Sequence, residues 1–335
     1  MKSRKHATYV FILIGMVSFV FFANYIHYFN MDIAYVRNGI LLNILAIAAN
    51  ICIGLSAIFA TRYLEKEGYD CLLFVLSPLL FGILVLLLKT VGVSVIGCYW
   101  WLTFGVITIH YFQYVLYLLF IVMPIGIDGI IKKNFKCEKS LFSAITFINM
   151  LLLMFTKDLQ GMVWYGVFSV LYYSYKRGIH ILPTATIVIS ILSGVAYNLL
   201  TDKLFHIYKT SIDINANMFA YAYPLISLKH EFSIGAVILV IVLEILICCL
   251  LGSYVKKYVG IVYKQRASVL YIIMAGMWTI DIILDLLTID ILHYGSTPFA
   301  TNQGFVYLVP IIIIFSLADK SNGGYRKCRR VERRD

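Results

Sequence analysis

The chain alternates long apolar runs with short polar breaks, and the length of each run is the first indication of the fold. A helix needs roughly 20 apolar residues to cross the hydrocarbon core of a bilayer. Segments that meet or approach this length lie near 8–29, 38–60, 70–91, 108–130, 141–156, 160–175, 179–200, 232–254, 267–290 and 303–318. Because these runs lack the alternating pattern of barrel strands, they predict an all-α membrane protein with about ten transmembrane helices in a single polytopic domain, 1–335.

The pattern raises two questions, one about a pair of short helices and one about the first span. The fifth and sixth predicted helices are short, and only the residues KDLQ at 157–160 separate them. They fit either a tight helical hairpin or one broken, re-entrant element. The opening MKSRKH resembles the basic start of a signal peptide, but the apolar run after it is too long and has no small-residue cleavage site, which predicts an uncleaved first span.

Composition supports a membrane location. Of the 335 residues, 61% are hydrophobic and only 13% are charged, whereas a soluble domain carries about 25% charged residues. Most of the outer surface must therefore face lipid, and the lipid bilayer is the first expected partner.

The distribution of charge predicts the topology. With ten spans, 22 of the 28 Lys and Arg residues lie in the loops and tail on the amino-terminal side of the membrane. The positive-inside rule then predicts that both termini are cytoplasmic. The basic tail at 326–334 could suggest nucleic acid, but directly after a transmembrane helix such a cluster fits anionic lipid headgroups, so no nucleic-acid partner is expected.

The seven cysteines give no metal signature. They form no CxxC pair and no Cys/His ligand spacing, and several lie inside apolar runs. They are predicted to be small buried hydrophobic residues, and no metal centre is expected.

One outer loop is much longer than the others. Residues 201–231, between the seventh and eighth predicted spans, are rich in charged, amide and tyrosine side chains. Long loops are where function usually concentrates, so this segment is the first place to look for chemistry on the outer face.

Several acids lie inside predicted spans, where they cost several kcal/mol unless they are paired or functional. Asp281, Asp285 and Asp290 lie on the ninth span, and the first two share a face because they are four residues apart. Glu244 lies in the eighth span and Asp128 near the inner end of the fourth. Each fits either a partner on a neighbouring helix or a polar cavity, cation site or proton path.

Four short motifs resemble those of the SEDS glycosyltransferases (shape, elongation, division and sporulation), whose members include FtsW, RodA and SpoVE. The family has a turn near N-G-x-x-R-W-I-x-L-G followed by F-Q-P-S-E; here residues 97–105 read GCYWWLTFG and residues 109–113 read IHYFQ. Trp101 and Gly105 match, Gln113 stands where the family has Glu, and the family's basic residues are missing. Before the sixth span, the family's P-D-L-G-T resembles KDLQG at 157–161, which retains the acid Asp158.

The other two motifs flank the last three spans. Before the eighth span, the family's G-E-E-x-G-F-I-G resembles LKHEFSIG at 228–235. Between the ninth and tenth, P-F-x-S-Y-G-G resembles PFATNQG at 298–304, with Gly295 just before it. The four matches occur in family order and at the expected span boundaries, across about two thirds of the chain, residues 97–318.

The resemblance implies a divergent FtsW/RodA/SpoVE-like protein in the bacterial plasma membrane, with a SEDS-like bundle and a role in cell-wall synthesis, cell division or cell shape. Such proteins polymerise the lipid-linked disaccharide precursor of peptidoglycan on the outer face of the membrane, beside a partner transpeptidase, a penicillin-binding protein. One departure bears on catalysis: the family's outer loop carries H-T-D-F, whose Asp is its proposed general base. The corresponding residues 219–222 read FAYA and contain no acid.

Glycosyl transfer of this kind needs a carboxylate to accept the proton of the attacking hydroxyl, and cationic or hydrogen-bonding groups near the departing diphosphate. On the predicted outer face, the candidate bases are Asp213, Glu231 and Asp158. The candidate substrate-binding residues are Trp101, Gln113, Lys203, Lys209, Lys229, Pro298 and Gly304. A divalent cation is left open.

Other functions compete with this one. The missing acid and basic residues favour a catalytically degenerate member that serves as a membrane scaffold for a partner transpeptidase. The acids of the ninth span favour a lipid-linked sugar flippase or transporter, although no inverted-repeat pattern supports it. A polysaccharide polymerase or ligase outside the peptidoglycan pathway is also compatible with many spans and one long outer loop.

Overall fold

A computed structural model describes most of the chain. The described residues are 8–10, 12–18, 33–95, 98–104, 107–156, 159–200, 233–286 and 304–331. They belong to two compact units, which are described separately. Unit 2 is formed mainly by the continuous stretch Phe59–Tyr208, and unit 1 by the segments Met1–Ile58, Lys209–Ile289 and Tyr294–Asp335.

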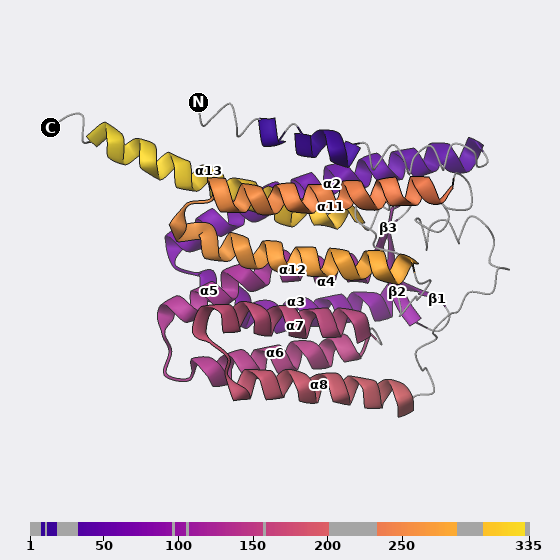
Figure 1. Cartoon of the computed structure of the whole chain (residues 1–335). Helices are drawn as coiled ribbons and strands as arrows, with labels where there is room; N and C mark the ends of the chain where they lie inside the picture. The colour runs from indigo at the N-terminus through magenta and orange to yellow at the C-terminus, as the bar shows by residue number, and fades with distance from the viewer. Residues whose placement is uncertain are drawn as a thin grey trace. The chain divides into compact units, whose positions relative to one another are not determined.

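Unit 2 is a bundle of helices with a small sheet (Figure 1). It begins with the end of α2 (Ile33–Glu67), a helix that starts in unit 1. Its other helices are α3 (Asp70–Thr90), α4 (Tyr111–Tyr117), η1 (Leu118–Val122), α5 (Met123–Lys133), α6 (Glu138–Met154), α7 (Leu159–Arg177) and α8 (Ile181–Leu200).

Helix α3 illustrates how the sequence positions this bundle. Its buried side chains Phe74, Ser77, Phe81, Leu84 and Leu88 are spaced by three and four residues and therefore form one stripe. The remaining positions carry exposed aliphatic side chains rather than polar ones. A helix that is apolar on every side suits a membrane, where one face packs on protein and the other on lipid.

The predicted fourth span is a continuous helix of three parts, α4, η1 and α5, of which η1 is a wide π-helical stretch. Pro124 lies just after this stretch, at the start of α5. Proline has no backbone N–H to donate, and a widened turn relieves the local break in the helical hydrogen bonds. Further along, α5 packs against α3 at Gly126 and Gly129. A Cβ added at Gly129 would lie only 2.2 Å from the backbone nitrogen of Cys71.

A three-stranded antiparallel sheet precedes this helix, in the order β1-β2-β3. The strands are β1 (Gly92–Val95), β2 (Cys98–Phe104) and β3 (Ile107–His110). The predicted span 108–130 is therefore wrong at its start, because Thr108, Ile109 and His110 belong to β3. Residues 92–110 are rich in β-branched and aromatic side chains, which favour strands over helices.

The short fifth and sixth predicted helices form a hairpin of two antiparallel helices. The start of α6 contacts the end of α7 through Glu138 and Arg177, and the middles of the two helices meet at Asn149 and Tyr165. Whether these two helices cross the membrane or form a re-entrant element stays a prediction.

Unit 1 contains a short helix at Thr8–Ser18, the start of α2, and the helices α11 (Ile234–Tyr258), α12 (Ile261–Leu286), η2 (Gly304–Tyr307) and α13 (Leu308–Val331). Helix α12 packs on both α11 and α13. At one end of α11, Tyr254 packs its ring against Phe315 of α13 (4.8 Å between centroids) and near Tyr9 (6.4 Å). Lys257 donates a hydrogen bond to the Tyr9 hydroxyl (3.0 Å), which fixes the short amino-terminal helix to α11.

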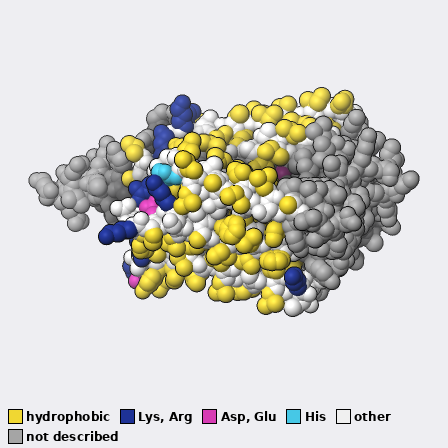
Figure 2. All heavy atoms as spheres, turned by 90° about the horizontal axis from the view of Figure 1, so that it is seen from below, with side chains coloured by type: hydrophobic (Ala, Val, Ile, Leu, Met, Phe, Trp, Pro, Cys, Tyr) yellow, Lys and Arg dark blue, Asp and Glu magenta, His cyan; other side chains and the backbone are white. Residues whose placement is uncertain are grey.

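The outer surface is that of a membrane-embedded protein. Within the described ranges, five helices are long and apolar enough to cross a bilayer: Ile47–Glu67, Asp70–Thr90, Tyr114–Lys133, Ile234–Tyr258 and Ile261–Ile283. Figure 2 shows a broad apolar face whose Lys and Arg side chains gather mainly at one end. The total of ten spans and the cytoplasmic location of both termini stay predictions.

The prediction that the cysteines are buried is wrong for the five whose side chains are described. Cys52, Cys137 and Cys249 are exposed, and Cys71 and Cys248 are partly exposed. The reason is physical: an apolar run in a membrane helix contains lipid-facing positions as well as protein-facing ones, so apolar neighbours do not predict burial within the protein.

Candidate functional site

The small sheet places two of the predicted substrate-binding residues at one end of unit 2. Trp101 lies on β2, paired with Val93 of β1 and with His110 of β3. Gln113 follows three residues after His110, in the first turn of α4. Because β1 begins directly after α3, we call this region the sheet end of unit 2.

The turn between α6 and α7 lies at the same end. Lys89, next to last in α3, places its ammonium group 5.5 Å from the centroid of the Phe155 ring, just after α6. Asp158 follows within this turn but lies outside the described residues. Its location on the outer face stays a prediction.

Most of the other candidates also lie outside the described residues: Asp213, Glu231, Lys203, Lys209, Lys229 and Pro298. Gly304 is described, as the first residue of η2 in unit 1. The structure therefore brings Trp101 and Gln113 into one region and gives no geometry for the candidate bases.

Near η2, unit 1 contains a buried polar group within apolar helices. The Tyr307 hydroxyl donates a hydrogen bond of 2.5 Å to the Asp281 carboxylate, and the Trp278 ring lies 5.7 Å from the Tyr307 ring. Glu244 on α11 is also buried. Asp281, one of the intramembrane acids that the sequence singled out, is thus hydrogen-bonded to Tyr307, which the sequence reasoning missed.

The other acids of the ninth predicted span are less well placed. The side chain of Asp285 and the whole of Asp290 lie outside the described residues. Only Asp281 of the three can be assigned a partner, and the shared face of Asp281 and Asp285 stays a prediction.

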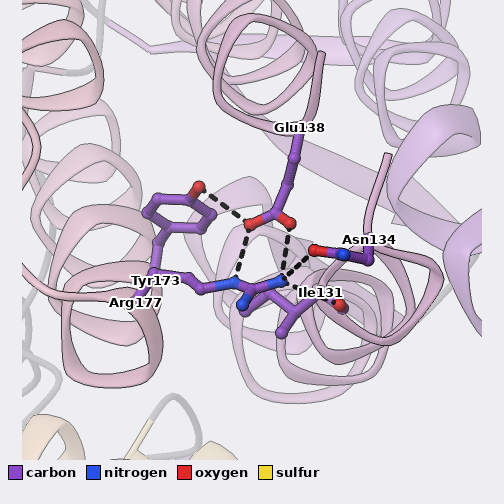
Figure 3. Close-up of polar contacts among 5 residues, drawn as sticks. All are labelled: Ile131, Asn134, Glu138, Tyr173 and Arg177. Atoms are coloured by element: carbon purple, nitrogen blue, oxygen red, sulfur yellow. Dashed lines mark hydrogen bonds and ion pairs between the residues drawn. The ribbon is translucent and has the colours of Figure 1, made fainter. Parts of the chain in front are cut away.

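The opposite end of unit 2 holds an ion pair within a network of hydrogen bonds, which Figure 3 shows in close-up. Arg177 of α7 binds Glu138 of α6 side-on, with its Nε 3.1 Å from Oε1 and its Nη2 2.8 Å from Oε2. The same Nη2 donates to the Asn134 side chain (3.0 Å) and to the carbonyl of Ile131 (3.1 Å), while the Tyr173 hydroxyl donates to Glu138 (2.9 Å). We call this the ion-pair end of unit 2.

These contacts have a clear electrostatic and structural effect. The hydrogen bond to Glu138 raises the pKa of the Arg177 guanidinium above its ordinary value. Asn134 ends α5 in the left-handed conformation (φ 49°, ψ 49°). Arg177 therefore satisfies a carbonyl at the carboxyl-terminal end of α5 while it pairs with α6.

Two more ion pairs lie in unit 2 near this end. Lys132 contacts Asp70 at 3.0 Å, and Lys176 contacts Asp128 at 3.3 Å. Asp128, which the sequence left open between a functional and a paired acid, is therefore paired with a basic residue of a neighbouring helix. The sequence signal that could have found these pairs is the placement of acids and bases at the same predicted membrane boundary.

Between the two ends, a buried amide links three helices. Asn149 of α6 donates to the hydroxyls of Ser77 (2.7 Å) and Tyr165 (2.6 Å), and the Tyr165 hydroxyl lies 3.3 Å from the sulfur of Met123. Asn149 and Tyr165 are fully buried. A polar contact of this kind inside a membrane helps to fix which helices are neighbours.

The described residues contain no group of three or more His, Cys, Asp or Glu side chains that could hold a metal ion. At the ion-pair end, Asp70, Asp128 and Glu138 are each engaged by a basic side chain.

Neither family models nor curated protein sequences match the chain. Solved structures do. A variant of the rod shape-determining protein RodA of Thermus thermophilus aligns with a TM-score of 0.59 and 17% identity, over 92% of this chain and 97% of that one. The RodA fold is the fold of this chain.

Two further structures agree. Another structure of Thermus thermophilus RodA aligns with a TM-score of 0.57 and 16% identity, over 92% of this chain and 96% of that one. A chain from a structure described as a peptidoglycan synthase complex that coordinates polymerization and crosslinking aligns with a TM-score of 0.59 and 15% identity, over 93% and 98% of the two chains. The RodA fold thus extends over nearly the whole chain, with low sequence identity.

Proposed function

We propose that this chain is a divergent SEDS-type protein of cell-wall synthesis, acting in cell division or cell shape, which polymerises a lipid-linked disaccharide on the outer face of the bacterial plasma membrane. The observation that carries the proposal is the RodA fold, matched over 92% of this chain and 97% of RodA. The four motif resemblances, in family order at the expected boundaries, support it independently.

The proposed chemistry is the transfer of one glycosyl group. A hydroxyl of one sugar attacks the anomeric carbon of another, the new glycosidic bond forms, and the bond to the lipid diphosphate breaks. A carboxylate accepts the hydroxyl proton, and basic side chains stabilise the departing diphosphate. We assign the base to Asp213 first, then to Glu231 and Asp158, and the cationic role to Lys203, Lys209 and Lys229.

Asp213 ranks first because of its sequence neighbours. Hydroxyl and amide residues surround it at 210, 211, 215 and 217, and they can hydrogen-bond a carboxylate and keep it ionised. Glu231 lies three residues before the first residue of α11, Ile234, and near a helix start the positive end of the dipole favours a carboxylate for stability alone. Asp158 ranks third because the family has an acid there that is not its proposed base.

The proposal includes a partner. One of the structures with this fold belongs to a peptidoglycan synthase complex described as coordinating polymerization and crosslinking. A polymerase that works beside a crosslinking enzyme needs a membrane transpeptidase, so a penicillin-binding protein is the partner we propose.

The test is polymerisation of purified lipid-linked disaccharide by the full-length protein in detergent, with and without a co-expressed membrane transpeptidase. We expect glycan polymer, resolved on a gel, in at least the sample with the partner. If no polymer forms in either sample while the partner co-purifies, the protein is a scaffold. That outcome is favoured by one specific observation, the absence of an acid at 219–222.

A further inference from the structure

We propose that two adjacent loops at the ion-pair end of unit 2 bind the headgroups of anionic phospholipids. The first loop joins α5 to α6, and the second joins α7 to α8. Their exposed side chains form what we call the basic loop surface: Lys133, Phe135, Lys136, Lys139, Ile179 and Ile181. This inference is separate from glycan polymerisation and does not depend on it.

The two loops are held beside each other by the contacts of Figure 3. Arg177, at the end of α7, binds Asn134 in the first loop and Glu138 at the start of α6. Tyr173 stacks on Phe142 of α6 at 4.3 Å and lies 6.1 Å from the ring of His180 in the second loop. The surface is therefore preformed, so little ordering is needed when a headgroup binds.

The charge at this end is strongly positive at the surface. Three acids here are each engaged by a basic side chain: Asp70 by Lys132, Asp128 by Lys176 and Glu138 by Arg177. Two more acids, Glu65 and Glu67, lie in the last turn of α2 beside the basic residues Arg62 and Lys66. Lys133, Lys136 and Lys139 are exposed on the same segment. Their ammonium groups are thus directed toward the surroundings, where phosphate groups of lipid are the natural counter-charge.

The same surface exposes large apolar side chains. Ile179 is 85% exposed, Ile181 is 88% exposed and Phe135 is 41% exposed. In water such positions would be unfavourable, but at the interface of a bilayer they can insert between headgroups while neighbouring lysines contact phosphate. Nucleic acid would match the lysines only, whereas an anionic lipid matches both the charge and the apolar groups.

The test uses full-length protein in neutral detergent, titrated with phosphatidylglycerol or phosphatidylcholine, with bound lipid counted by native mass spectrometry. We expect the wild type to retain phosphatidylglycerol in preference to phosphatidylcholine. The triple variant Lys133→Gln, Lys136→Gln, Lys139→Gln should lose affinity by about fivefold for each lysine removed. The variant with arginine at the same three positions should bind as the wild type does.

The double variant Lys136→Gln, Lys139→Gln is compared with a matched control that removes two exposed lysines elsewhere, Lys66→Gln and Lys89→Gln. The control should keep the wild-type affinity, because the basic loop surface is intact. A second variant, Ile179→Ser with Ile181→Ser, should weaken binding of phosphatidylglycerol while leaving all charges in place. Equal loss in the two double variants would mean that only total charge matters. Equal retention of the two lipids by the wild type would mean that the surface recognises no anionic headgroup. Either result overturns the proposal.

Discussion

At the scale of single residues, polar side chains in unit 2 are used mostly to hold helices together. Glu138 is buried between α6 and α7, and it accepts hydrogen bonds from both Tyr173 and Arg177. The sequence indicated that acids near span boundaries would be paired or functional, but it could not name their partners. Partner choice depends on which helix ends meet in space, and for Glu138 and Arg177 that requires two helices to form a hairpin.

The first prediction concerns this pair. Arg177→Gln should lower the stability of the protein by roughly 2 kcal/mol, because it leaves the buried Glu138 carboxylate without its cation, with the effect reduced by the partial exposure of Arg177. Thermal unfolding in detergent, followed by circular dichroism, measures the loss.

Lys66→Gln is the matched control for that change. Lys66 is 82% exposed and lies 3.8 Å from Glu67, so its removal should change stability by less than about 0.5 kcal/mol. Equal unfolding temperatures for the two variants would show that Arg177 has no special role in the bundle.

At the scale of elements, the sequence predicted helices well where apolar runs were long, and less well at their boundaries. Residues 107–110 form a strand where the start of a helix was expected, since an apolar β-branched stretch fits both. Close packing between helices could also not be predicted from the sequence. Gly126 and Gly129 look like ordinary glycines of an apolar run, but they are the points where α5 approaches α3.

The second prediction tests this approach. Gly129→Ala should destabilise the protein by about 1–3 kcal/mol, because its Cβ would overlap the backbone of Asp70 and Cys71, which cannot move independently of α3. The unfolding temperature in detergent is again the measurement.

Gly82→Ala is the control, since a Cβ at Gly82 meets nothing within 4 Å. It should leave stability unchanged or raise it by up to about 1 kcal/mol, the difference in helix propensity. If Gly129→Ala is as stable as Gly82→Ala, then α3 and α5 are not packed as closely as described.

At the scale of the whole molecule, composition alone predicted a membrane protein, and the order of four weak motifs predicted the SEDS resemblance that the RodA fold now supports. The candidate site was harder to predict from the sequence. Trp101 and Gln113 could be placed from motifs at the sheet end, but the choice of base could not, because the family's acid is missing at 219–222. Without that match, only general chemistry ranks Asp213 above Glu231 and Asp158.

The third prediction concerns topology. Ten spans with both ends in the cytoplasm place residue 213 outside and residues 4 and 330 inside. Single cysteines at these three positions, in a background whose native cysteines are replaced, should react with an impermeant maleimide on intact cells only at 213. Labelling of 4 or 330 before the cells are opened contradicts the proposed orientation.

The most direct test of the proposed function is the polymer yield of Asp213→Asn beside the wild type at matched expression, with the partner transpeptidase present. Loss of a true base should reduce the rate on the order of 100-fold or more, while Met218→Ala in the same segment should keep most of the yield, because no role in binding or catalysis is assigned to Met218. Glu231→Gln and Asp158→Asn identify the base if Asp213→Asn remains active. We expect polymer from the wild type and its loss in one of the three acid variants. Wild-type yield from all three variants would contradict the mechanism. No polymer from the wild type would contradict the proposed activity itself.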